Sequence, residues 1–164
     1  MILPAELENV PFFQGLDEPH RNRIAQIAQL EECTAGTRLF RQGDETSCIY
    51  FVLDGSVRLE VEEHEGNSVE IACAGTGDLV GWSPVLECGG MTATARATTR
   101  CRLAVLNVRQ IRNLCESDPG FGMAFFRQIA RVLSCRLSST RRHLVLAHTL
   151  SQRSPFVPAA DSED

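Results

Sequence analysis

The sequence has no apolar run approaching the ~20 residues that a helix needs to cross a bilayer. No basic region precedes an apolar core at the N-terminus, so no signal peptide is expected. Lysine is absent: all 16 basic residues are arginine, and with 21 acidic residues the formal net charge is -5. A negative protein is not attracted broadly to nucleic acid. We therefore expect a soluble, cytoplasmic protein that is not associated with a membrane.

Closely spaced pairs of cysteines are also missing. Structural zinc and iron–sulfur sites usually take ligands from such pairs, and secreted disulfide frameworks usually use an even number of cysteines. We expect no metal site, and most of the cysteines to be small buried residues in a reducing compartment. A redox role for one of them is an open alternative. The seven are widely spaced: Cys33, Cys48, Cys73, Cys88, Cys101, Cys115 and Cys135.

No enzyme motif is present, so we expect no catalytic residues. His143 and His148 are five residues apart, which is not the spacing of four that places two imidazoles together on a helix. His64 lies among glutamates, as is typical of a solvated loop. Ser83 has no Gly-x-Ser-x-Gly around it. The glycines of Gly75-Thr76-Gly77 are not followed by the Gly-Lys-Ser/Thr of a phosphate loop.

The first half of the chain predicts helices followed by closely spaced strands. A short helix is expected over Pro4–Val10, and a second runs from a cap at Asp17 to about Glu32. Alternating apolar residues and glycine turns then predict successive strands, which favours a barrel or sandwich over alternating strand–helix units. The predicted strands include Leu39–Phe40, Cys48–Leu53, Val57–Val61, Val69–Cys73 and, later in the chain, Arg102–Leu106.

Helical periodicity returns in the last third. Asn107 is a candidate cap for a helix that reaches Glu116, and Asp118 with Pro119 begins a long helix. Its apolar stripe either packs on its own barrel or forms the seam of a homodimer, and periodicity alone leaves both open. The stripe residues are Phe126, Ile129, Leu133 and Leu137. We expect one domain over residues 1–150 and a disordered tail over residues 151–164.

The chain is organised around the stretch from Gly77 to Leu86, which reads as a strand, a glycine turn and one short helix. Ser83 followed by Pro84 predicts a helix start in which the serine side chain accepts from the free amides of the first turn. Such amides attract anions. A break at Gly89-Gly90 and another strand follow. The stretch therefore predicts either a small anion site or an ordinary capped turn.

The order of these features resembles the cyclic-nucleotide-binding domain of catabolite-activator-type regulators, protein kinase A regulatory subunits and cyclic-nucleotide-gated channels. Gly43-Asp44 and Ile49–Leu59 look like the family's glycine-punctuated strand pair. Gly77–Gly81 is similar to the strand leading into its phosphate-binding cassette, and Ala95-Arg96-Ala97 to the strand leaving it. The resemblance covers about residues 10–146. It implies a mainly β fold, a β-roll (double-stranded β-helix, jelly-roll-like) with N-terminal helices and a long C-terminal helix.

The resemblance also implies cyclic AMP or cyclic GMP as ligand, but two charged determinants differ. Trp82 stands where the family has the glutamate that holds the ribose, and Met91 where it has the phosphate-binding arginine. Each arginine–phosphate hydrogen bond is worth roughly 1.5–3 kcal/mol. Arg96 is an odd number of residues from Met91 and points to the other face of a strand. The expected ligand-binding residues are Val80, Gly81, Trp82, Ser83, Val85, Met91, Thr92, Ala93 and Thr94.

The functional expectation is a stand-alone regulatory or sensor module that binds a cyclic nucleotide or another small anion weakly. The alternative is a domain that does not bind nucleotides and acts as homodimer or adaptor, with an unknown protein partner, through its C-terminal helix. The activator-type members carry a winged helix-turn-helix after that helix. Only about a dozen residues follow Leu150 here, so no sequence-specific DNA binding is expected.

Overall fold

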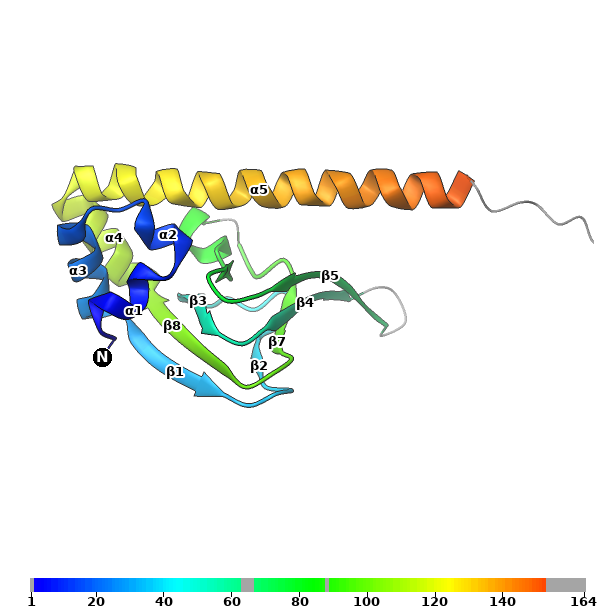
Figure 1. Ribbon diagram of the computed structural model, residues 1–164, viewed down its shortest axis with the longest axis horizontal. Coiled ribbons are helices and arrows are strands. Elements are labelled where there is room, and N and C mark those ends of the chain that lie inside the picture. The colour runs from blue at the N-terminus through cyan, green and yellow to red at the C-terminus, as the bar shows by residue number, and fades with distance from the viewer. Residues whose placement is uncertain (1, 63–66, 88, 153–164) are drawn as a thin grey trace, which may run out of the picture. The chain divides into compact units, whose positions relative to one another are not determined.

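The computed structural model describes residues 2–62, 67–87 and 89–152 of the 164-residue chain (Figure 1). The chain divides into two compact units, Met1–Ile129 and the segment from Ala130 onward. The predicted turn around His64 and residues 153–164 of the predicted tail lie outside the described residues.

Three short helices open the first unit: α1 (Pro4–Glu8), α2 (Pro11–Gln14) and α3 (Glu18–Ile27). Asp17 caps α3, because its carboxylate accepts a 3.0 Å hydrogen bond from the His20 amide. The prediction that this helix continues to about Glu32 is wrong. It ends at Ile27, and the next residues form strand β1 (Gln29–Cys33), whose backbone pairs with strand β8 (Cys101–Asn107).

The strands form two antiparallel four-stranded sheets, ordered β1-β8-β3-β6 and β2-β7-β4-β5. The mainly β architecture with helices that the sequence predicts is therefore confirmed. The remaining strands are β2 (Arg38–Phe40), β3 (Cys48–Asp54), β4 (Val57–Glu62), β5 (Ser68–Ala74), β6 (Leu79–Val80) and β7 (Thr94–Ala97).

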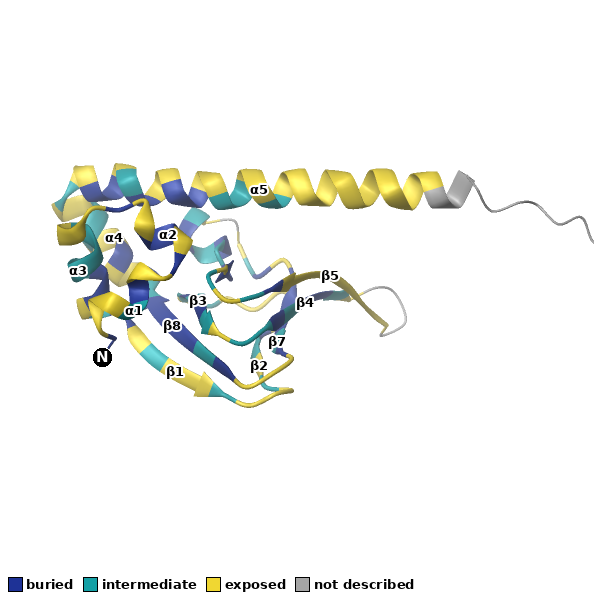
Figure 2. Cartoon of the chain, in the orientation of Figure 1, coloured by how far each residue is buried: buried dark blue, intermediate teal, exposed yellow. Residues whose placement is uncertain are grey.

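One buried cluster, here called the roll interior, takes residues from both sheets. Its members are apolar, and four of them are alanine. Figure 2 shows β8 largely in dark blue, whereas β1 and β5 are largely yellow. The members are Phe40, Val52, Val57, Leu59, Ala74, Val80, Met91, Ala93, Ala95, Ala97, Cys101, Leu103 and Val105.

The other face of the first sheet packs against helices. Phe51 of β3 lies with its ring centroid 4.9 Å from that of Phe12 and 4.5 Å from that of Phe13, both in α2. Phe12 in turn lies 5.2 Å from Phe125, in the first turns of the last helix. β3 thus alternates between the roll interior and the helices, as a strand buried on both faces must.

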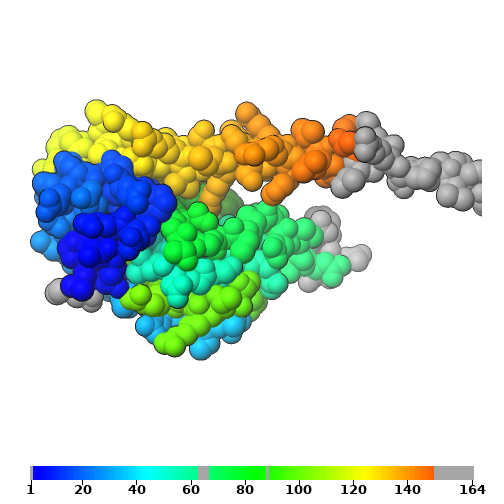
Figure 3. Space-filling model, in the orientation of Figure 1, coloured from blue at the N-terminus to red at the C-terminus, as the bar shows by residue number. Residues whose placement is uncertain are grey.

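Two further helices follow β8: α4 (Val108–Ser117) and α5 (Pro119–Gln152). Asn107 and Asp118 cap them through the amides of Arg109 (2.9 Å) and Phe121 (3.0 Å), as the sequence predicts. The first turns of α5 lie against the N-terminal helices (Figure 3).

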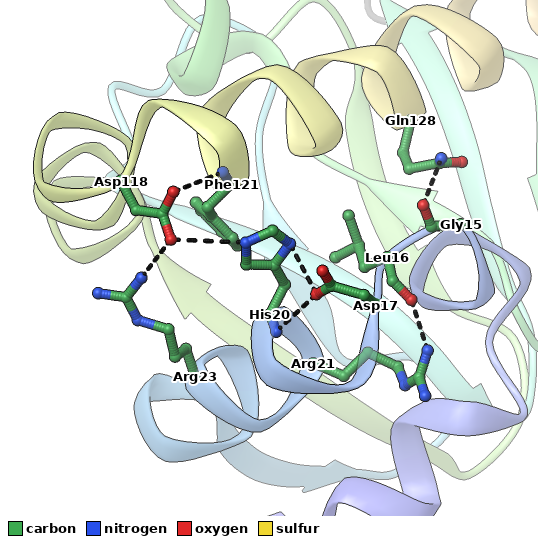
Figure 4. A network of polar contacts seen from close by, with 9 residues as sticks. All are labelled: Gly15, Leu16, Asp17, His20, Arg21, Arg23, Asp118, Phe121 and Gln128. Atoms are coloured by element: carbon green, nitrogen blue, oxygen red, sulfur yellow. Dashed lines mark hydrogen bonds and ion pairs between the residues drawn. The ribbon is translucent and has the colours of Figure 1, made fainter.

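Polar contacts tie the start of α5 to α3 and the loop before it (Figure 4). Asp118 forms a 2.7 Å ion pair with Arg23 and lies 3.5 Å from His20. The buried side chain of Gln128 donates a 3.3 Å hydrogen bond to the carbonyl of Gly15. The hydrogen bonds and ion pairs of this network hold residues 118–128 against α3 and the loop before it.

The second unit, as far as it is described, is the continuation of α5 to Gln152. Ser151 and Gln152, predicted to begin the tail, are helical. Large apolar side chains are exposed here: Leu137, Leu144, Val145 and Leu146. In the described part of the chain, no helix has the length and apolar character needed to span a membrane.

Candidate ligand-binding site

The nine predicted ligand residues fall in one connection between the two sheets, here called the cassette (residues 80–94, Cys88 not described). It leaves the first sheet at Val80, which pairs with Tyr50 of β3, and enters the second sheet at Thr94, which pairs with Glu60 of β4. Between them lies a single turn of 3-10 helix, η2 (Ser83–Leu86).

The start of η2 differs from the prediction. Trp82, not Ser83, occupies the capping position, and no side-chain hydrogen bond caps the turn. The backbone of Trp82 is already helical (φ −76°, ψ −13°), which moves Ser83 inside the turn. The amide of Val85 donates to the carbonyl of Trp82 at 3.0 Å, so this first donor after Pro84 is not available to an anion. The predicted serine cap is therefore wrong.

Gly81 adopts a left-handed backbone (φ +75°) beneath two apolar side chains. A β-carbon placed there would lie 3.0 Å from Cε1 of Phe40 and 3.1 Å from Cε of Met91. The space beside the Gly81 backbone is thus taken by the protein's own side chains.

Met91 is buried, with 3% of its surface exposed, and belongs to the roll interior. Its backbone is held on both sides: its carbonyl accepts from the Gly43 amide at 2.7 Å, and its amide donates to the Asp44 carbonyl at 2.9 Å. The Gly43-Asp44 turn, first noted as part of the strand-pair pattern, therefore fixes the position of Met91 within the cassette.

The side chains of the residues after Met91 point in different directions. Ala93 faces the roll interior, Thr92 is exposed, and the hydroxyl of Thr94 accepts a 3.0 Å hydrogen bond from the Gln42 amide. Arg96 lies outside the interior cluster, and its guanidinium donates to the Gly36 carbonyl at 2.9 Å. This agrees with the predicted opposite orientation of Met91 and Arg96.

The remaining predicted residues are apolar or already packed. Val80, Ser83 and Val85 are buried. Trp82 is half-buried and is not part of the roll interior. The structure therefore brings Val80, Met91 and Ala93 together inside the roll, while Thr92 and Trp82 are left more accessible.

Sequence reasoning missed a contact from α4 to the cassette. The guanidinium of Arg112 donates to the Pro84 carbonyl at 3.3 Å and forms a 2.8 Å ion pair with Glu87. Glu87 ends η2 in a left-handed conformation (φ +54°) that is unusual for a residue other than glycine. A basic residue in the helix directly after β8 was the only sequence signal, and nothing in the spacing paired it with Glu87.

The charge distribution of the cassette is unsuited to a phosphate. Glu87 is the only charged side chain in residues 80–94, and it is acidic. Beside the cassette, Tyr50 lies opposite Val80 with its ring centroid 5.8 Å from that of Phe40. Burial raises the pKa of Tyr50, which indicates a poorly solvated surrounding that disfavours charge. Among the described residues, no group of three or more His, Cys, Asp or Glu side chains could hold a metal ion.

Comparison with known proteins points to one domain family. The family model of the cyclic nucleotide-binding domain matches residues 30–118. A putative potassium channel protein of Rhodopseudomonas palustris is 32% identical over 67% of this chain and 26% of its own length. The catabolite activator protein of Thermus thermophilus is 27% identical with a TM-score of 0.70, over 84% of this chain and 63% of that one.

A third similar structure is a mutant of the regulatory subunit of a cAMP-independent protein kinase A from Trypanosoma brucei, bound to cAMP in its A site. It is 26% identical with a TM-score of 0.68, over 85% of this chain and 49% of that one. The chain thus spans about a quarter of the channel relative and less than two thirds of the two structural neighbours.

Proposed function

The chain belongs to the cyclic nucleotide-binding domain family, and on that premise we propose that it is a regulatory module that keeps the fold without the charged contacts to a nucleotide. The burial of Met91 is the observation that carries this proposal. At the position of the family's phosphate-binding arginine, the chain has an apolar side chain that fills the roll interior.

A cyclic nucleotide bound here would have to leave its phosphate without a cationic partner. Transfer of a charge into a poorly solvated site is expensive unless it is paired and hydrogen-bonded. The cassette offers no basic side chain, and the amide of Val85 is already bonded. The ligand would also have to displace the contacts of Phe40 and Met91 over Gly81. Cyclic AMP or cyclic GMP would therefore bind only weakly.

The similar kinase regulatory subunit supports this view. It comes from a protein kinase A described as cAMP-independent, and the form bound to cAMP is a mutant. This indicates that members of the fold can exist without a cyclic AMP response, and that substitutions in such a member are compatible with cyclic AMP binding. Signalling would then depend on a different ligand or on a protein partner that favours one of two arrangements of the helices.

Titration calorimetry of the full chain with cyclic AMP and cyclic GMP tests the proposal. We expect no saturable heat up to high micromolar ligand for the unmodified protein. The double substitution Trp82→Glu with Met91→Arg should introduce measurable binding, because it adds the acidic side chain for the ribose and the basic side chain for the phosphate. The matched control, Trp82→Gln with Met91→Leu, changes the same positions without charge and should not bind. Tight, saturable binding to the unmodified chain would refute the proposal.

Self-association through α5 is a second candidate function, favoured by its exposed apolar residues. Leu133, Leu137 and Leu144 are spaced by four and seven residues and so lie along one face of the helix. Leu137 and Leu144 are exposed. Ile129, predicted as part of the same seam, is buried within the single chain and is therefore not free to contact a partner. We place the proposed dimer contact at residues 133–144, and Phe126, also exposed, extends the apolar surface.

Sedimentation equilibrium measures this directly. If α5 forms the seam, Leu137→Glu should shift the protein from dimer to monomer, because it places a charge in an apolar contact. Ser138→Glu, at an exposed neighbouring position, should leave the dimer intact. A monomeric unmodified protein at tens of micromolar would rule out this candidate.

A further inference from the structure

Two cysteines that are far apart in the sequence face each other across the first sheet. Cys33 is the last residue of β1 and Cys101 is the first residue of β8, and the two are directly paired in the antiparallel register. Directly opposed residues in such a ladder have Cα atoms about 4.5 or 5.5 Å apart, depending on the pair type. Both separations lie within the range of about 4.4–6.8 Å that a disulfide bridges.

The side chains of this pair also interact. Burial is the main cause that raises the pKa of Cys33, and the neighbouring Cys101 adds to it. Cys101 is fully buried in the roll interior, with its sulfur 3.3 Å from the carbonyl of Ser56. Cys33 is only half-buried. Cys33 is therefore the more accessible residue of the pair, and Cys101 the more buried.

The backbone around the pair can accommodate a bond. β1 is an edge strand, so Cys33 has a paired strand on one side only. Both residues are at strand ends, where β1 leads into a turn and β8 follows one. Because β8 is the only strand that pairs with β1 in this sheet, a movement of β1 toward β8 would disturb no second strand pair of β1.

We propose that Cys33 and Cys101 are a modification site, a dithiol that low-molecular-weight disulfides such as oxidised glutathione convert to a disulfide between β1 and β8. The Cys33 thiolate attacks one sulfur of the reagent, whose S–S bond breaks and releases one glutathione thiolate. As Cys101 attacks the Cys33 sulfur, its proton passes to the departing glutathione sulfur, which leaves as the second thiol. The protein loses two electrons, and one glutathione disulfide is reduced to two thiols.

The other described cysteines lack such an arrangement. Cys48 is paired with Asn107, Cys115 lies on α4, and Cys135 is exposed on α5. Cys73 is exposed with its sulfur 3.1 Å from the hydroxyl of Ser56, and its paired residue is Arg58. Within the described part of the chain, Cys33 and Cys101 are the one directly opposed cysteine pair.

The disulfide would tie an edge strand to the centre of the first sheet. β8 pairs with both β1 and β3 and leads directly into α4. A link at the end of β1 closes a loop of the chain from Cys33 to Cys101 and restricts the unfolded state, so the oxidised protein should unfold at a higher urea concentration. Oxidation would thus stabilise the roll.

Peptide mapping after an acid quench, which stops thiol exchange, tests the proposal on the full chain. The protein is reduced, freed of reductant, incubated folded with oxidised glutathione, then acid-quenched, denatured and alkylated. We expect a cross-linked peptide pair that contains Cys33 and Cys101, reversal by dithiothreitol, and a raised urea midpoint for the oxidised form. Cys33→Ser should abolish both the cross-link and the increase in the urea midpoint, whereas Cys73→Ser should leave both unchanged. Circular dichroism checks that each variant is folded.

Three outcomes would overturn the proposal. One is a stable mixed disulfide on Cys33 with Cys101 still alkylated, because it would show that the second thiol cannot resolve the first. Another is a predominant cross-link to a different cysteine, within one chain or between chains. The last is full alkylation of both residues after prolonged exposure to the oxidant.

Discussion

The methyl carbon of Met91 lies over Gly81, at 3.1 Å from the point where a β-carbon on that glycine would be. Gly81 directly follows β6 and Met91 lies between η2 and β7, so the contact brings the two ends of the cassette together. Phe40 completes the cover at 3.0 Å from the same point. The packing of the cassette therefore depends on the absence of a side chain at Gly81.

Gly81→Ala should destabilise the fold more than an equivalent change at a glycine with open space around it. Gly81 combines a positive φ with tight contacts, whereas Gly89 has a similar φ of +79° and nothing within 4 Å of an added β-carbon. We expect Gly89→Ala to lower the free energy of unfolding by about 1 kcal/mol from backbone strain, and Gly81→Ala by about 2–4 kcal/mol, because overpacking is added. Urea denaturation of both variants gives the comparison. If both variants lose the same free energy of unfolding, the side chains of Phe40 and Met91 move aside without cost.

Met91→Arg alone should be strongly destabilising. It places an unpaired charge among the apolar residues of the roll interior, a change that costs on the order of 3–5 kcal/mol in buried sites. Met91→Leu keeps the volume and should cost less than about 1.5 kcal/mol. Thr92→Arg adds the same charge at an exposed position and should stay within about 0.5 kcal/mol of the unmodified protein. A Met91→Arg variant as stable as Thr92→Arg would mean that the arginine reaches solvent.

Much of the fold could be predicted because its signals are local. The alternation Val57, Leu59 and Val61 predicts a strand directly, and β4 (Val57–Glu62) is found there. The caps Asp17 and Asn107 are each confirmed by a hydrogen bond from an amide two or three residues later. Each of these signals depends only on neighbours in the sequence.

The errors arise where a distant partner decides the structure. The segment from Gln29 to Glu32 continues a helical pattern, but pairing with β8 makes it part of a strand. Ser83 has the local chemistry of a cap, but the backbone of Trp82 already begins the turn. The contact of Arg112 with the Pro84 carbonyl joins residues 28 positions apart and leaves no local trace in the sequence. The family resemblance located the cassette, but only packing shows that Met91 fills the interior.

Arg112→Ala should loosen η2 without unfolding the protein. The ion pair with Glu87 is exposed, so its loss should cost less than about 1 kcal/mol in overall stability. The effect should instead appear at the Val85 amide, whose hydrogen bond to Trp82 lies in the turn that Arg112 holds. Hydrogen exchange followed by NMR should show faster exchange at Val85. Arg109→Ala, exposed on the same helix, should not change it.

The Asp118 carboxylate should make the fold sensitive to acid. The hydrogen bond from the Phe121 amide is the main cause that lowers the pKa of Asp118, and His20 and Arg23 add to it. Because the folded state lowers this pKa, the charged form stabilises the fold above the unfolded value of about 3.9. That stabilisation is lost as the pH falls through the still lower folded value. The 2.7 Å ion pair between Asp118 and Arg23 is lost as the Asp118 carboxylate becomes protonated.

Asp118→Asn separates the charge from the cap, because asparagine also caps helices well. We expect the variant to have a lower Tm than the unmodified protein at pH 6, and the difference to shrink toward zero as the pH falls below about 4. Thermal unfolding between pH 3 and pH 6 measures this. Glu116→Gln, an exposed carboxylate near the end of α4, should leave the Tm unchanged across the series. If the Tm difference between Asp118→Asn and the unmodified protein stays constant with pH, the charge of Asp118 does not stabilise the start of α5.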